Sequence, residues 1–160
     1  MRLLQYRQLE RNQKLIVNEA AKRLEMMKVV SGLTAVSGPG LQIEIRDPER
    51  GIAYYDLVDI VNELRAAGAE AIGIEGVRVR AESRITPGDH IRVDGEKLTA
   101  PYLILAIGDP ATLEQALAMP GGFKDSLTPL SGVEIAIETS GQIILPAAEA
   151  KELKWGKPVE

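Results

Sequence analysis

The first thirty residues carry an apolar pattern with a helical period. From Leu3 to about Val30 there is no proline or glycine, and helix-forming residues dominate. Apolar side chains recur at steps of three and four residues, so they share one helix face. This stripe, with one polar interruption, consists of Tyr6, Leu9, Gln13, Ile16, Ala20, Leu24 and Met27. The pattern predicts a long amphipathic, coiled-coil-like helix over residues 1–31 that either packs back on the remaining chain or pairs with a second copy.

Residues 32–160 form a second unit in which strand and helix patterns alternate. Two runs are continuously apolar, as in strands covered on both faces, and two alternate between apolar and polar residues. The predicted strands are 41–46, 71–74, 102–107 and 133–137. Helix patterns occupy residues 55–67 and 110–119, and Asp109 followed by proline opens the second one. Ser37-Gly38-Pro39-Gly40 and Thr139-Ser140-Gly141 are predicted turns.

The order of these elements predicts an α+β fold. Strand, helix, strand, strand, helix, strand is the split βαβ order of ferredoxin-like folds, with both helices on one face of the sheet. Two further segments, 77–80 and 91–94, alternate valine or isoleucine with arginine or aspartate. They predict an added β-hairpin of half-exposed strands.

The composition narrows the chemistry. The chain has 160 residues and no cysteine, which excludes disulfides, thiolate metal sites and cysteine nucleophiles. His90 is the only histidine, so a histidine metal cluster is excluded, and no phosphate-binding P-loop motif occurs. No stretch reaches the roughly 18 consecutive apolar residues of a membrane span. We therefore expect neither a catalytic centre nor a cofactor or metal.

Charge is distributed unevenly along the chain. Residues 1–31 contain seven Lys/Arg and three Asp/Glu, whereas the remainder contains twelve and twenty. A basic arm on an acidic body suggests contact with something anionic, such as a membrane surface, although a merely solvated helix fits equally. The acidic body has few aromatic side chains for stacking bases, so no nucleic-acid partner is expected.

An arginine-rich stretch is the main candidate for a binding surface. Arg78, Arg80 and Arg84 share strand parity, and Arg92 lies on the next predicted strand. Guanidinium groups on one face could bind a carboxylate or a phosphate. Alternatively, they form structural ion pairs with acidic side chains nearby in sequence, namely Glu75, Glu82 and Glu96.

Four motifs in a fixed order resemble a known family. They are Ser37-Gly38-Pro39-Gly40-Leu41, the stretch Asn62 to Ile72, the stretch Pro101 to Pro110, and Gly132-Val133-Glu134-Ile135. Together, over about residues 32–146, they resemble the bacterial DUF881 family. Members typically carry a membrane-spanning helix, then a coiled coil, then this domain outside the cytoplasm. Some are labelled division initiation proteins, and no enzymatic activity is established for the family.

The resemblance implies a non-enzymatic interaction domain of a cell-envelope protein with a link to cell division. It implies a place at the cell membrane, as the extracytoplasmic domain of a single-pass protein whose anchor is absent from this chain. Residues 1–31 would then bind a second copy, another envelope or division protein, or the membrane surface. The basic arm favours the opposite, cytoplasmic side if it flanks a span, so the membrane side stays open.

Site residues follow from the positions that match the family. Gly68, Gly108 and Asp109 have structural explanations, as a helix C-cap, a strand-to-helix turn and a helix N-cap. The remaining matches without such an explanation, together with the neighbouring arginines, form the candidate ligand- or partner-binding set: Asn62, Glu70, Arg78, Arg80 and Arg92. The alternative function is that of a small anionic-ligand sensor, or of an enzyme of unknown reaction, that uses this set.

Overall fold

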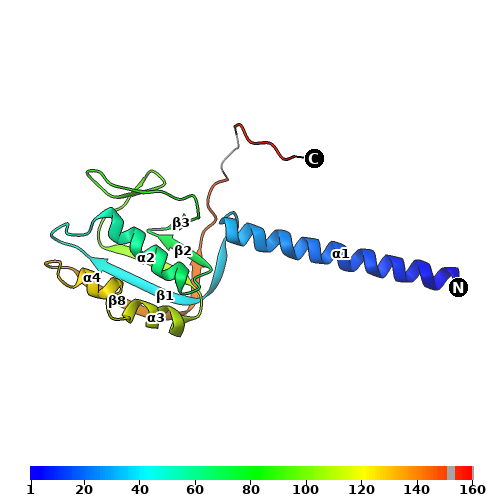
Figure 1. The fold of residues 1–160 in the computed structure, drawn as a ribbon, viewed down its shortest axis with the longest axis horizontal. Helices are drawn as coiled ribbons and strands as arrows, with labels where there is room; N and C mark the ends of the chain where they lie inside the picture. The colour runs from blue at the N-terminus through cyan, green and yellow to red at the C-terminus, as the bar shows by residue number, and fades with distance from the viewer. Residues whose placement is uncertain (151–153, 160) are drawn as a thin grey trace.

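The computed structural model describes residues 1–150 and 154–159, and its most prominent element is a projecting helix. Helix α1 (Arg2–Ser31) leaves one end of the body as a straight rod (Figure 1). None of its residues is buried, so the expectation that it could pack back on the remaining chain is wrong. Gly32 ends the helix as predicted, in the left-handed conformation with φ 78° that glycine adopts without a steric penalty.

The body is built on a five-stranded antiparallel sheet with the order β3-β2-β7-β1-β8. β1 and β2 are each antiparallel to β7, which lies between them, so β1 and β2 run in the same direction. The strands are β1 (Val36–Arg46), β2 (Ala71–Ile74), β3 (Val77–Val79), β7 (Tyr102–Ile107) and β8 (Glu134–Leu145).

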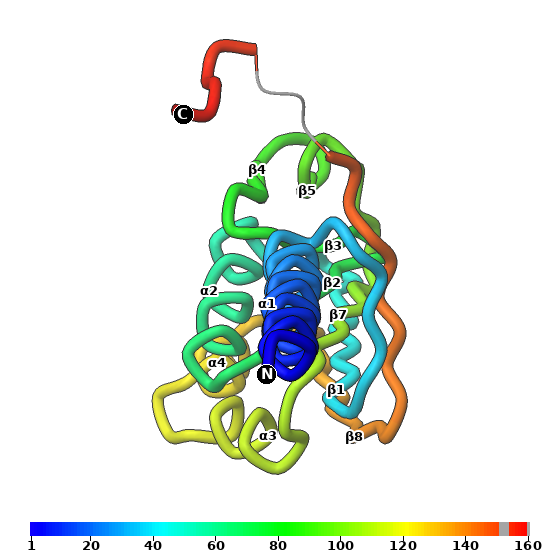
Figure 2. The backbone as a smooth tube through the Cα atoms, turned by 90° about the vertical axis from the view of Figure 1, so that its right-hand side faces the viewer, coloured from blue at the N-terminus to red at the C-terminus, as the bar shows by residue number. Residues whose placement is uncertain are grey.

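Three helices cover one face of this sheet (Figure 2). They are α2 (Tyr54–Ala66), α3 (Pro110–Ala118) and the short α4 (Phe123–Leu127), which the sequence pattern did not predict. Between the layers lies an aliphatic core, since aliphatic residues dominate a chain with one phenylalanine. The molecule is thus a mixed α+β protein with an N-terminal helix, as expected.

Both predicted glycine turns are wrong, because the segments continue as strand. Ser37 to Gly40 belongs to β1, with a bulge between Gly38 and Gly40. A Cβ atom on Gly40 would lie 1.8 Å from the carbonyl oxygen of Ala106, so glycine is needed there for close backbone approach. Residues 139–141 lie within β8, and the far end of β8 buries two apolar side chains, Ile143 and Leu145, in a second small cluster with Ala71 and Ile107.

The predicted added hairpin is also wrong in its pairing. Residues 77–79 form β3, which pairs with β2 at the edge of the main sheet. A separate three-stranded sheet follows, formed by β4 (Ile85–Thr86), β5 (Arg92–Val93) and β6 (Glu96–Lys97). Val79 and Val93 are both buried in the common core, although their segments pair with different strands. Their alternation with arginine predicted half-exposed strands but not these pairings.

Candidate functional site

Arg78 is a buried arginine that ties α1 to the body. Its side chain lies on β3, and the residue is 3% exposed. One terminal nitrogen, Nη1, donates to the carbonyl oxygens of Thr34 at 2.9 Å and Pro146 at 3.2 Å. The other, Nη2, donates to the carbonyl oxygen of Val29 at 2.9 Å. One guanidinium group therefore holds the last turn of α1, the linker into β1 and the segment after β8.

The position of Arg78 suits the chemistry of a helix end. The last carbonyl groups of a helix have no partner within the helix, and they carry the negative end of its dipole. A cation that donates hydrogen bonds there satisfies both requirements. Burial lowers the pKa of the Arg78 guanidinium, yet an arginine keeps its proton at neutral pH. Arg78 is thus directed at backbone of its own chain.

Gly32 and Arg80 complete this connection, which we call the joint. A Cβ atom on Gly32 would lie 2.7 Å from Cγ of Arg80, so the chain passes closely over that side chain. The Gly32 carbonyl accepts a hydrogen bond from the Ala148 N–H at 2.7 Å. Arg80 forms an ion pair with Glu82 at 3.2 Å. The joint consists of Val29, Gly32, Thr34, Arg78, Arg80, Pro146 and Ala148.

A hollow of about 810 Å³ lies beside the joint. Arg78, Arg80 and Arg84 line it, although β3 ends at Val79, so a turn and not shared strand parity places Arg84 there. Four carboxylates line it as well, belonging to Glu82, Asp94, Glu96 and Glu149. The arginine cluster is therefore balanced by acids, which favours structural ion pairing over anion binding.

The other predicted site residues lie elsewhere. Arg92 is outside this hollow, and its Nη1 donates to the Gly95 carbonyl at 3.2 Å within the small sheet. Asn62 is exposed on α2, and Glu70 is exposed before β2. Of the five predicted residues, the structure brings only Arg78 and Arg80 together.

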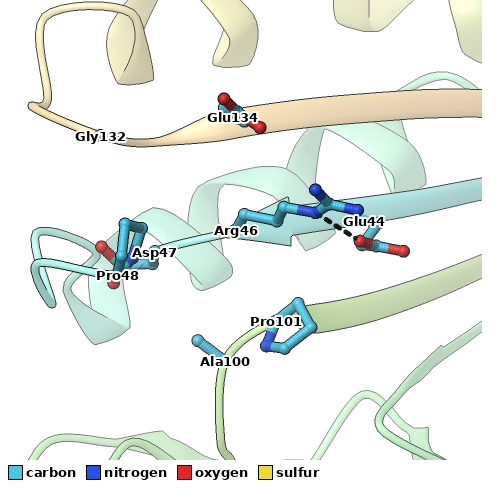
Figure 3. Close-up of a pocket in the computed structure, with 8 residues that line it drawn as sticks. All are labelled: Glu44, Arg46, Asp47, Pro48, Ala100, Pro101, Gly132 and Glu134. Carbon is cyan, nitrogen blue, oxygen red and sulfur yellow. Dashed lines mark hydrogen bonds and ion pairs between the residues drawn. The ribbon is translucent and has the colours of Figure 1, made fainter.

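The end of the body opposite α1, which we call the tip, carries two adjacent hollows of about 490 Å³ each. The first lies across the start of β8, the end of β1 and the residues just before β7 (Figure 3). There Arg46 Nε donates to Glu44 at 3.0 Å, and Glu134 stands opposite Arg46 in the strand pairing. The hydrogen bond from Arg46 to Glu44, with the nearby charges of Glu44 and Glu134, raises the pKa of Arg46. In this hollow the charged side chains of Glu44, Arg46 and Glu134 stand beside the apolar Pro48, Ala100 and Pro101.

The second hollow, which we call the tip hollow, has an apolar floor and a polar rim. The floor includes the buried side chains of Ile52, Ile91 and Leu98 and the ring of Tyr102. Polar residues around it come from separate loops and comprise Asp47, Arg50, Asp89, His90 and Thr99. Sequence reasoning did not find this site because its residues are spread over more than fifty positions. The one available signal was that Tyr102 lies in the stretch Pro101 to Pro110, one of the four motifs that resemble the family.

In residues 1–150 and 154–159, no three His, Cys, Asp or Glu side chains are grouped so that they could hold a metal ion. Nor does any helix in those ranges combine the length and apolarity needed to cross a bilayer.

The structure therefore defines a class: a small α+β body with a projecting helix, a joint built on a buried arginine and an open tip. The chain belongs to the family described as "Bacterial protein of unknown function (DUF881)", whose sequence profile matches residues 23–157. The family resemblance seen in the sequence motifs is thus confirmed.

Similar proteins agree with this assignment. UPF0749 protein Rv1825 of Mycobacterium tuberculosis is 36% identical over 150 residues, which cover 90% of this chain and 51% of that protein. UPF0749 protein YlxW of Bacillus subtilis is 29% identical over 140 residues, covering 80% of this chain and 60% of that protein. A crystal structure of an uncharacterized conserved protein from Mycobacterium tuberculosis matches with a TM-score of 0.78 and 36% identity, covering 86% of this chain and 99% of that one. The chain spans about half the length of UPF0749 protein Rv1825.

Proposed function

We propose that this chain is a non-enzymatic interaction module whose projecting helix binds a second copy of itself. One observation carries the proposal: the joint holds α1 away from the body while the predicted stripe stays uncovered. Leu9 is 57% exposed, Ile16 is 67% exposed and Leu24 is 54% exposed. Apolar side chains at helical spacing stabilise a helix when they are buried, and none of residues 1–150 and 154–159 covers this stripe.

A parallel two-stranded coiled coil suits this arm. A helix of 30 residues is about 45 Å long, enough for roughly four heptads. A helix gains most of its stability from packing its apolar face against a partner, so pairing would also stabilise α1 itself. The polar Gln13 within the stripe and the charges beside it would set the register at some expense in affinity.

Paired variants test this proposal on the full chain. Leu9→Glu with Ile16→Glu places two charges in the stripe, whereas Leu4→Glu with Leu15→Glu places the same charges on another face of α1. By light scattering, we expect the wild type and the second variant to reach twice the 17.4 kDa of one chain at high concentration. The stripe variant should stay a monomer. A monomeric wild type, or equal masses for both variants, would contradict self-association.

The cellular setting that we propose follows the family resemblance. The module would belong to the cell envelope, at the membrane, as the extracytoplasmic domain of a single-pass protein, with a link to cell division. Family membership supports this setting. The basic, exposed arm supports contact with an anionic membrane surface, and beside a span it favours the cytoplasmic side instead. Adding protease to intact bacteria, and then to permeabilised ones, tests the membrane side: an extracytoplasmic body is cleaved in both. Sedimentation with anionic vesicles separates a membrane-bound arm from a self-associating one.

We also infer that the body is a ferredoxin-like split βαβ unit. Without β3, the sheet order is β2-β7-β1-β8, and α2 and α3 connect the strands on one face. Such a fold does not by itself assign a function. The alternative of a small-anion sensor at the predicted arginine set has less support, because Arg78 is bonded to backbone and the neighbouring hollow is lined with acids.

A further inference from the structure

The tip hollow has the features of a binding site for a small molecule. Its volume of about 490 Å³ lies within the range typical of ligand pockets. Such pockets combine an apolar lining with a few polar groups that fix the orientation of the ligand. Here the floor is apolar, and polar side chains of several loops surround it.

Tyr102 provides the most specific feature of the hollow. The residue is 7% exposed and belongs to the core, yet it also lines the hollow. In the part of the chain that the structure describes, no protein group forms a hydrogen bond with its hydroxyl. Among the described residues, only Nε of Arg80 is a fully enclosed side-chain polar atom without a hydrogen-bond partner. The Tyr102 hydroxyl, which also has no partner there, is therefore not fully enclosed and keeps contact with solvent. A buried tyrosine normally finds a partner for its hydroxyl.

The hollow offers hydrogen-bond donors as well as carboxylates near this hydroxyl. Arg50 and Thr99 line the same hollow, and His90 lies beside them. The charge of Arg50 is close enough to affect the ionisation of Tyr102. Burial, the first cause, and the carboxylates of Asp47 and Glu75 raise the pKa of Tyr102, so its hydroxyl remains a protonated donor at neutral pH.

The acidic groups nearby are already occupied by backbone. Asp47 is buried, and its two oxygens accept from the N–H groups of Gly51 at 2.7 Å and Ile52 at 3.0 Å. The backbone of His90, chiefly, lowers the pKa of Asp89, with smaller contributions from the charges of His90 and Arg92. Their negative charges still limit how much anionic charge the hollow accepts.

We propose that the tip hollow binds a monocarboxylate joined to a short aliphatic group. The guanidinium of Arg50 and the hydroxyls of Tyr102 and Thr99 would receive the carboxylate. The apolar floor of Ile52, Ile91 and Leu98 would bury the aliphatic group. A monoanion matches the single arginine of a hollow that also carries Asp47 and Asp89 better than a phosphate dianion does. Planar carboxylates also suit arginine geometry. A free short-chain acid and the C-terminal leucine of a peptide share this chemistry.

The test measures binding to the full chain by amide chemical shifts and by calorimetry. The probes are 3-methylbutanoate and its neutral amide, acetyl-Ala-Leu with a free carboxyl and its amide, and inorganic phosphate. We expect saturable shifts at Thr99, Ala100 and Tyr102 with one or both carboxylates, and none with the amides. Stronger binding of the free acid identifies a metabolite as the source, and stronger binding of the dipeptide identifies a peptide end.

Two variants and a matched control decide the role of the residues. Tyr102→Phe removes one hydroxyl from a side chain of the same shape and should weaken binding about three- to tenfold. Arg50→Gln lies on the exposed rim and should weaken it about tenfold or more, which keeps the test decisive if the core variant does not fold. Arg84→Gln, in the hollow beside the joint, should leave the affinity unchanged.

Three outcomes would overturn the proposal. One is the absence of saturable shifts with both carboxylates up to concentrations of tens of millimolar. Another is binding of phosphate or of the neutral amides as strong as that of the carboxylates. The third is unchanged affinity in both Arg50→Gln and a folded Tyr102→Phe.

Discussion

Helices α1 and α2 show how similar sequence patterns lead to opposite surroundings. In α2, four apolar side chains over 13 residues are buried against the sheet, namely Leu57, Ile60, Val61 and Leu64. In α1, 30 residues contain more apolar side chains, and none is buried. Periodicity therefore predicts a helix with an apolar face, but it does not say whether the partner lies in the same chain.

The connections at the helix ends account for the difference. Short loops join α2 to β1 and β2, and these strands run in the same direction with β7 between them. A helix between two such strands must return across the sheet, which brings its apolar face onto the core. By contrast, Gly32 and Arg78 hold the C-terminal end of α1 so that the helix points away from the body.

The largest expected effect compares equal substitutions in the two helices. Leu64→Ala removes a fully buried side chain of α2 and should lower the free energy of unfolding by about 2–5 kcal/mol. Leu15→Ala in α1 affects a side chain that is 62% exposed and lies outside the stripe, so its effect should stay below about 0.5 kcal/mol. Urea unfolding at low protein concentration measures both. A comparable loss for both variants would show that α1 is covered in solution.

A smaller but still large effect is expected at the joint. Arg78→Ala removes a hydrogen-bond donor from three carbonyl groups, of which Val29 keeps the Gly32 N–H as a second donor. It should lower the free energy of unfolding by about 2–3 kcal/mol. Amide exchange at Ala148, whose N–H is bonded to the Gly32 carbonyl, should accelerate as α1 loosens.

Arg84→Ala is the matched control for this prediction. Arg84 is exposed in the hollow beside the joint, so its removal should change stability by less than about 0.5 kcal/mol. Equal free energies of unfolding for Arg78→Ala and Arg84→Ala would show that the joint is not what holds α1.

Features that depend on residues near in sequence were predicted from the sequence, and features that depend on distant residues were not. Regular elements such as α2 and β7 were predicted because their patterns are local. The Gly38–Gly40 segment was mistaken for a turn, since the need for glycine there comes from the Ala106 carbonyl on another strand. Arg78 was selected as a site residue, but its role depends on Val29 and other backbone distant in sequence.

The tip hollow shows the same limit more strongly. Its residues come from three loops between Asp47 and Ala100 and from the start of β7, and none of these loops carries a recognisable motif. Only the folded sheet brings the end of β1 next to the start of β7, where Ile45 pairs with Tyr102. A site of this kind is found from three-dimensional contacts.

The smallest expected effect concerns how a packed helix begins. Asp109 caps α3, where it accepts from the Thr112 N–H at 3.0 Å and from the Thr112 hydroxyl, whereas the first turn of α1 has no side-chain cap. These hydrogen bonds, the hydroxyl one first, lower the pKa of Asp109. Asp109→Ala should therefore lower the midpoint of thermal unfolding at pH 7, while Gln5→Ala at the start of α1 should not.

The pH dependence of that midpoint separates the charged cap from a general packing effect. Because the pKa of Asp109 is lower in the folded chain, its contribution is complete above the ordinary aspartate pKa of about 3.9. It is then lost as the pH falls through the lower folded value. The difference in midpoint between wild type and Asp109→Ala should accordingly narrow below about pH 4, as scanning calorimetry between pH 7 and pH 2 can measure. A difference in midpoint that stays constant over that range would mean that the charge of the Asp109 carboxylate does not stabilise the start of α3. The missing side-chain cap would then not distinguish the first turn of α1 from that of α3 in stability.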